Sequence, residues 1–166
     1  MPPSHHSAQP VDPTAFSALI AEVTSRIQGQ PVDAALQRTL ESAFPAQGEV
    51  VARIRAACEA AIAAGWMCNR EHAGIRYGRV VKPGEATHGF SVDVVNMNDV
   101  AGGHHRHPHG EIDLVMPVDA TARFDGQGAG WVVYPAGSAH VPTVSGGRAL
   151  VLYLLPQGAI EFTKSA

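Results

Sequence analysis

Three histidines and one glutamate are the residues in this sequence with the clearest potential for chemistry. His105, His107 and Glu111 follow the spacing HxHxxxE, and His140 ends the phrase PAGSAH that begins at Pro135. Imidazole suits transition metals such as iron, nickel, copper and zinc, and a carboxylate adds a hard oxygen ligand with one negative charge. These residues predict a site for one divalent transition metal ion, and they leave iron, manganese, nickel and zinc all open as its identity.

The spacing of the first motif fits an extended strand. Successive side chains on a strand point to opposite faces, so His105 and His107 share a face. Pro108-His109-Gly110 predicts a turn, because proline fixes φ and glycine tolerates angles that other residues avoid, and the turn lets Glu111 return to the same ion. A histidine-rich surface loop is the alternative, since residues 104–109 hold four histidines. The distant second half, PxGxxH, favours the metal site.

The two halves together resemble the paired metal-binding motifs of the cupin superfamily, over residues 74–162. Three positions depart from the family pattern: Gly130 lies one residue too close to Pro135, Val144 replaces the final asparagine, and Pro117-Val118 occupies the stretch where a glycine would close the first motif. All four ligand positions are nevertheless filled. The resemblance implies a single jelly-roll barrel that binds one metal ion, and it implies a homodimer.

Composition limits the other classes of protein. The 166 residues are enough for one domain, and 45% apolar with 16% charged residues is ordinary for a globular chain. A net charge of −3 without a basic cluster argues against a nucleic-acid partner. No run approaches the ~18 apolar residues of a membrane span and no export signal is evident, so we expect a cytoplasmic protein that does not bind membranes. Cys58 and Cys68 are expected to be reduced, buried thiols.

The pattern changes along the chain from helical to extended. We expect residues 1–11 to be disordered, residues 12–66 to form a helical region packed on the barrel, and residues 67–166 to form the barrel itself. Capping signals and apolar periodicity predict three helices, from Asp12-Pro13 to about Gly29, from about Asp33 to just before Pro45, and from Glu49 to Ala64 with Gly65 at the C′ position.

Short β-branched and aromatic runs with turn residues between them predict a mainly β barrel or sandwich after residue 74. The expected strands cover residues 75–81, 89–97, 111–118, 121–124, 131–134 and 149–155, and a further strand is expected at 159–162.

Residues near the predicted metal site are candidates for acid–base chemistry. Asp113 should share the strand face of Glu111, where it could act as an acid or base or hold a ligating imidazole. Alternatively, Asp113 could bond to backbone amides at the mouth of the barrel. Glu111 and His109 are further candidates for catalysis.

An early strand carries the candidate substrate-binding residues Arg76, Tyr77 and Arg79. An inward arginine there would bind a substrate carboxylate with two hydrogen bonds. The alternative is that these arginines face solvent, as most strand arginines do.

Over residues 12–162, the helical region followed by GEIDLVMP, GWVVYPAGSAHVPTV and ALVLYLLPQGAIEF resembles the 4-hydroxylaminobenzoate lyase family. The resemblance implies conversion of a small aromatic acid, 4-hydroxylaminobenzoate, to 3,4-dihydroxybenzoate with release of ammonia, in the breakdown of nitrobenzoates. Asp113 or His109 would then transfer protons, and Arg76 or Arg79 would anchor the aromatic carboxylate. An iron-dependent cupin dioxygenase and a non-enzymatic cupin that senses a metal or small acid remain as alternatives.

Overall fold

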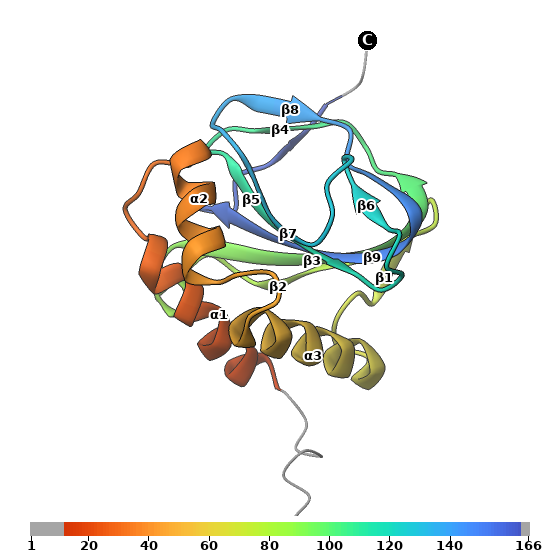
Figure 1. The fold of residues 1–166 in the computed structure, drawn as a ribbon, viewed down its shortest axis with the longest axis horizontal. Helices are drawn as coiled ribbons and strands as arrows, with labels where there is room; N and C mark the ends of the chain where they lie inside the picture. Colours follow the sequence, from red (N-terminus) through yellow and green to blue (C-terminus); the bar gives the residue numbers. More distant parts are fainter. Residues whose placement is uncertain (1–11, 164–166) are drawn as a thin grey trace, which may run out of the picture.

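The computed structural model describes residues 12–163 as three helices followed by a mainly β region. The expected disorder of residues 1–11 lies outside these residues. Figure 1 shows the first and third helices on one side of a large sheet, the second helix beside its edge, and the short strands at residues 105–107 and 138–140 on its other side. The helices are α1 (Pro13–Ile27), α2 (Ala34–Ala43) and α3 (Glu49–Ala64). The strands are β1 (Arg70–His72), β2 (Ile75–Val81), β3 (Phe90–Ala101), β4 (His105–His107), β5 (Glu111–Pro117), β6 (Arg123–Phe124), β7 (Gly130–Tyr134), β8 (Ser138–His140), β9 (Thr143–Pro156) and β10 (Glu161–Phe162).

The ends of the helices follow the capping signals of the sequence. The carboxylate of Asp12 accepts a hydrogen bond from the Ala15 N–H at 2.7 Å, and the carboxylate of Asp33 accepts one from the Leu36 N–H at 3.0 Å. Gly65 ends α3 with a φ of 90°, a left-handed angle that favours glycine. The structure confirms the three predicted helices. They could be predicted because capping signals depend on residues close together in the sequence.

Two antiparallel sheets form the β region. The larger has the order β1-β2-β3-β9-β5-β7, with β6 also paired to β9, and the smaller has the order β10-β4-β8. All the predicted strands are present, but β3 and β9 extend well beyond their predicted ranges. The strands β1 and β8 and the helical turn η2 (Glu85–Thr87) were not predicted. The three residues of β1 are all polar and exposed, so they lack the apolar alternation that reveals a strand.

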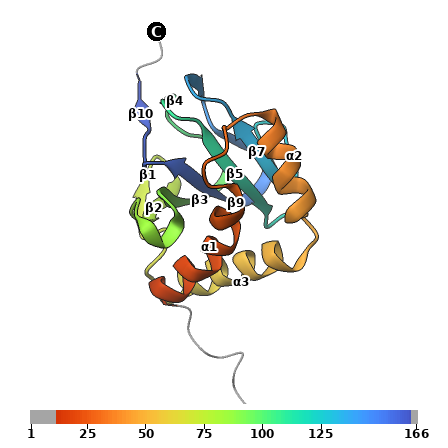
Figure 2. The same cartoon turned by 90° about the vertical axis from the view of Figure 1, so that its left-hand side faces the viewer.

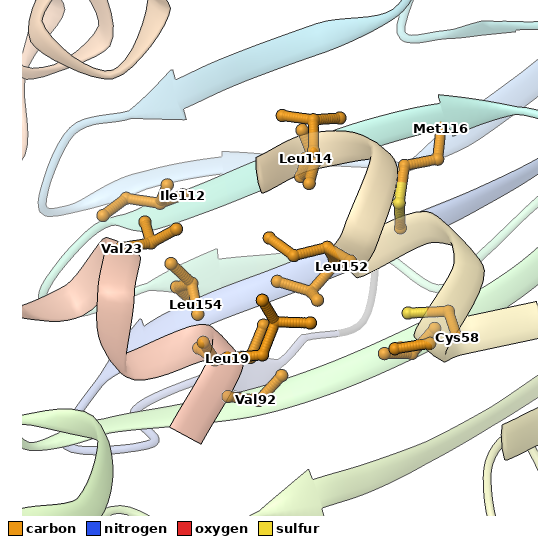
Figure 3. Packing of buried hydrophobic residues seen from close by; sticks show 14 of the residues in the cluster. Leu19, Val23, Cys58, Val92, Ile112, Leu114, Met116, Leu152 and Leu154 are labelled. Atoms are coloured by element: carbon orange, nitrogen blue, oxygen red, sulfur yellow. The ribbon is translucent and has the colours of Figure 1, made fainter. Parts of the chain in front are cut away.

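The larger sheet has an apolar core on each face. Its outer face packs against α1 and α3 through the side chains shown in Figure 3, including Leu19, Cys58, Leu114 and Leu152. Its inner face packs toward the smaller sheet, and Figure 2 shows β4 and β10 on the side away from α1 and α3. Side chains alternate between these faces along each strand. The inner face is therefore where a strand can present a polar group to the space between the two sheets.

Helix α2 covers β7, the strand at one edge of the larger sheet. The side-chain oxygen of Gln37 accepts a hydrogen bond from the Val133 N–H at 2.9 Å, and the indole N–H of Trp131 donates to the Phe44 carbonyl at 2.9 Å. These bonds satisfy backbone and side-chain groups that an uncovered edge would leave to solvent. Within residues 12–163, none of the helices has the length and apolar character needed to cross a membrane.

Candidate metal centre and adjoining cavity

The four predicted ligands converge between the two sheets. Strand β4 carries His105 and His107, β5 begins with Glu111, and β8 ends with His140. One ligand atom from each lies within 4.8 Å of the others. His105 Nε2 is 3.1 Å from both Glu111 Oε1 and His140 Nε2. Metal–nitrogen bonds of about 2.0–2.1 Å bring neighbouring ligand atoms to roughly this separation.

Hydrogen bonds hold each imidazole with its Nε2 toward the centre. The Nδ1–H of His105 donates to the Gly103 carbonyl at 3.3 Å, and that of His140 donates to Asp125 at 2.6 Å. The hydroxyl of Ser138 donates to the Pro135 carbonyl at 2.6 Å, so its oxygen is left to accept the Nδ1–H of His107 at 2.9 Å. With Nδ1 protonated in all three rings, the tautomers assigned from these bonds leave a lone pair on each Nε2.

Until a proton or a metal ion is added, the centre is therefore a cluster of acceptors without donors. Three Nε2 lone pairs face a carboxylate, and neither His107 Nε2 nor Glu111 Oε2 has a hydrogen-bond partner although both are buried. Only a cation relieves this arrangement. Burial acts to lower the pKa of His140, but its hydrogen bonds to Asp125 and Glu111 outweigh burial and raise the pKa to about 9. The residues present thus fit a bound divalent metal ion. The ion would replace the proton that the raised pKa adds to His140.

Asp125 is a functional candidate that the sequence reasoning missed. Its Oδ2 accepts hydrogen bonds from His140 at 2.6 Å and from the Tyr134 hydroxyl at 2.5 Å, and its Oδ1 accepts the Thr143 N–H at 2.9 Å. A carboxylate on the far nitrogen of a ligating histidine fixes the ring and increases its basicity. The dipeptide Asp125-Gly126 is typical of a turn, and the sequence gives no sign that its carboxylate also binds His140.

Asp113 lies on the inner face of β5, two residues after Glu111, as the alternation along the strand predicted. It is 0% exposed and neither carboxylate oxygen has a hydrogen-bond partner, so the alternative of backbone amide bonds does not hold. Burial and the neighbouring charge of Glu111 raise the pKa of Asp113 well above its usual value. Burial also acts to raise the pKa of Glu111, but the interactions of its carboxylate with the three histidines outweigh burial and hold this pKa far below the usual range.

The helical region contacts the turn that positions Glu111. Gly110 has a φ of +92°, and a Cβ at this position would lie 2.6 Å from a methyl carbon of Val32 in the α1–α2 loop. The Gly110 N–H closes the turn by donating to the His107 carbonyl at 3.2 Å. The predicted turn is confirmed, and it requires glycine both for its backbone angle and for the approach of Val32.

A cavity of about 900 Å³ adjoins the centre. Its walls come mainly from β1, β2, β3 and the C-terminal segment, and His105 is the metal-ligand candidate that lines it. The lining also includes Tyr77, Arg79, Asp93, Tyr153 and Phe162. A largely apolar pocket with a few polar groups beside a reactive centre is typical of a small-molecule site.

The structure places the other predicted site residues in different surroundings. Tyr77 and Arg79 lie on the cavity face of β2, whereas Arg76 points away and its side chain, 60% exposed, lies 3.7 Å from Glu71. His109 is exposed in the turn after β4 and is not part of the cluster. Of the predicted residues beyond the metal ligands, Asp113, Tyr77 and Arg79 therefore lie beside the centre or the cavity.

The fold and the site define a mainly β protein with a candidate metal centre, in which three histidines and one glutamate lie beside an open cavity. The family model PnbB, 4-hydroxylaminobenzoate lyase, matches residues 18–162. The chain belongs to the 4-hydroxylaminobenzoate lyase family, and the predicted family is confirmed.

Two relatives carry the name 4-hydroxylaminobenzoate lyase. The protein from Nocardioides sp. (strain LMS-CY) is 31% identical over 150 residues, which cover 85% of this chain and 86% of the relative. The protein from Pseudomonas putida is 29% identical over 161 residues, 87% of this chain and 92% of the relative. A chain from the crystal structures of the DMSP lyases RdDddP and RnDddQII has a similar fold, with a TM-score of 0.52 and 15% identity over 92% of this chain and 100% of that chain.

Proposed function

We propose that this protein is a metal-dependent lyase that converts 4-hydroxylaminobenzoate to 3,4-dihydroxybenzoate and ammonia. The reaction takes up one water for each ammonia released and has no net requirement for oxygen. Family membership supports the substrate. The observation that carries the proposal is the convergence of His105, His107, Glu111 and His140, with buried atoms of His107 and Glu111 left without a hydrogen-bond partner. Those residues would hold the metal ion.

When bound, a divalent metal would supply a Lewis acid for the N–OH group and a water of lowered pKa. The chain's own residues would orient the substrate and move protons. Asp113 is proposed as the proton donor to the departing hydroxyl, because its carboxyl group lies beside Glu111, is fully buried and has no hydrogen-bond partner. Glu111 would act as a ligand and as an acceptor of protons from water. His109, which is exposed, would need to approach the cavity to share this role.

The walls of the cavity would position the aromatic acid. Tyr77, Tyr153 and Phe162 offer ring surfaces, and their side chains line the cavity together with His105. Arg79, a predicted substrate-binding residue, also lines it, although its guanidinium is paired with Asp93 at 2.9 Å.

Anaerobic turnover tests the proposal. The purified protein, with its metal content measured, is incubated with 4-hydroxylaminobenzoate, and ammonia and 3,4-dihydroxybenzoate are quantified. We expect the two products in equal amounts without oxygen. Turnover that depends on oxygen would instead identify a dioxygenase, for which the same ligand set would be adequate. Stoichiometric binding without product would identify a sensing or binding protein.

We further propose that the two sheets form a cupin jelly-roll barrel, that residues 12–66 act as a helical region packed on it, and that the protein is a cytoplasmic homodimer. The exposed edge strand β1 supports pairing, since edges left open in this way are available to another chain. Sedimentation equilibrium tests the dimer, and a mass equal to one chain at micromolar concentration would contradict it.

A further inference from the structure

Two aromatic side chains are exposed to solvent at the cavity. Among the described residues, the exposed large apolar side chains are Tyr77, Val118, Val141 and Phe162, and the two aromatic ones both line the cavity. Phe162 is 74% exposed, yet its ring centre lies 5.6 Å from that of His105. Exposed aromatic surface gathered at one cavity marks a site for an apolar ligand. A ring bound against Phe162 would lie next to a metal-ligand candidate.

The charges that line the cavity are unbalanced. Its cationic side chains are Arg70, Arg79 and Lys82, and its carboxylate is Asp93. Arg79 and Asp93 neutralise one another through two hydrogen bonds, of 2.9 and 3.2 Å, and the same guanidinium also donates to the Gly158 carbonyl at 3.2 Å. Within residues 12–163, no carboxylate pairs with Arg70 or Lys82. The cavity therefore favours an anion, and Arg79 is largely committed to other partners.

Arg70 is better placed than Lys82 to bind a carboxylate beside a ring. The pairing of β1 with β2 sets Arg70 directly opposite Tyr77, and side chains in this relation have Cβ atoms roughly 4.5–5.5 Å apart on one face. A guanidinium presents two parallel N–H groups that match a planar carboxylate, whereas an ammonium acts as a point charge. Tyr77 would contact the ring while Arg70 meets its acid group.

We infer that Arg70 binds the carboxylate of an aromatic acid whose ring lies against Tyr77 and Phe162. This inference rests on the proposed function and assigns the anchor to a residue that the sequence did not suggest. The Arg79–Asp93 pair then serves to shape the wall and to tie β2 to the C-terminal segment at Gly158.

The inference is tested by binding, without turnover. Isothermal titration calorimetry on the metal-loaded protein compares 4-hydroxybenzoate with neutral 4-hydroxybenzamide, for the native chain and for Arg70→Gln, Arg70→Lys, Lys82→Gln and Arg55→Gln. Arg55 lies on α3, paired with Glu59 at 3.1 Å, and serves as the matched control. We expect Arg70→Gln to weaken the acid by about 10- to 100-fold, as for the loss of a charge-assisted hydrogen bond, and to leave the amide unchanged.

The remaining variants define the outcomes. Arg70→Lys should recover part of the affinity, and Lys82→Gln and Arg55→Gln should have little effect. An unchanged affinity in Arg70→Gln, a loss confined to Lys82→Gln, or equal binding of acid and amide by the native chain would overturn the inference. Equal losses for acid and amide would indicate a folding defect or a purely apolar role and would overturn it as well.

Turnover separates this inference from the proposed function. In the lyase assay, Arg70→Gln should raise the KM for 4-hydroxylaminobenzoate far more than it lowers kcat, because the anchor lies away from the reacting nitrogen. A native protein that binds 4-hydroxybenzoate through Arg70 but releases no ammonia would refute the lyase activity and leave the anchor intact.

Discussion

The two faces of β5 are equally buried but lie in opposite chemical surroundings. On the outer face, Ile112, Leu114 and Met116 pack against the helices, and each is at most 2% exposed. On the inner face, Glu111 and Asp113 are 0% exposed and keep oxygens without hydrogen-bond partners. Burial of aliphatic groups drives folding, whereas burial of unpaired polar groups opposes it. One strand therefore contributes stability from one face and chemical reactivity from the other.

The strongest test of the inner face is His105→Ala. Removing this ligand should abolish stable metal binding and lower turnover by at least about a thousandfold, since a metal supplies several kcal/mol of transition-state stabilisation. Elemental analysis and the ammonia assay measure both effects. Unchanged metal content and turnover would show that the reaction does not depend on a metal at this site. The claim that the inner face of β5 carries the chemistry would then be wrong.

The corresponding test of the outer face is Leu114→Ala. Leu114 is 0% exposed, and truncating it should lower the free energy of unfolding by about 2–5 kcal/mol because a cavity is left in the core. Urea unfolding gives the change, and metal content per folded chain should stay the same. Val118→Ala, at a position 46% exposed, is the control and should change stability by no more than about 0.5 kcal/mol. Loss of metal in folded Leu114→Ala would show that the faces are not independent.

A smaller effect is expected from Asp125→Asn, which keeps the shape of the side chain but removes the charge that holds His140. Metal affinity should fall by about 10- to 100-fold, the usual consequence of losing such a partner. Competition with a chromogenic chelator measures the affinity. Glu59→Gln, on the exposed surface of α3, provides the control for a lost carboxylate. An unchanged affinity would mean that backbone geometry alone orients the ring.

The smallest effect sharpens the comparison within β5. Asp113→Val should raise the free energy of unfolding of the metal-free protein by about 1 kcal/mol, because a buried carboxyl group without partners is replaced by an apolar one. It should also lower turnover if Asp113 donates a proton. Urea unfolding and the ammonia assay give the two readings. A decrease in the free energy of unfolding would show that Asp113 makes a stabilising interaction. Asp113→Val and Leu114→Ala would then both destabilise the protein, and the contrast between the two faces would fail.

Local signals explain what the sequence could predict. The caps at Asp12 and Asp33, the terminator Gly65 and the turn at Gly110 depend on interactions within a few residues. The ligand motifs were also recognisable, since strand alternation places His105 and His107 on one face.

Long-range pairing explains what the sequence could not predict. Asp125 meets His140 only because Asp125 sits in the turn closed by Phe124 and Gln127, next to the start of β9. Alternation placed Tyr77 and Arg79 on one face of β2 and Arg76 on the other, but it did not reveal which face looks into the cavity. The register between strands is needed to see that Arg79 pairs with Asp93 and that Arg70 lies opposite Tyr77. The inference that Arg70 binds the carboxylate depends on both.

The close approach of Val32 to Gly110 makes the N-terminal third part of the scaffold that supports the ligands. A β-methyl at residue 110 would collide with the α1–α2 loop at 2.6 Å, so that loop and the turn leading to Glu111 must change together in any descendant sequence. Grafting these ligands onto a smaller scaffold without residues 12–43 would remove the contact between Val32 and the turn that precedes Glu111. A smaller protein designed from this template should therefore keep α1, α2 and the loop between them, and residues should be removed from other segments.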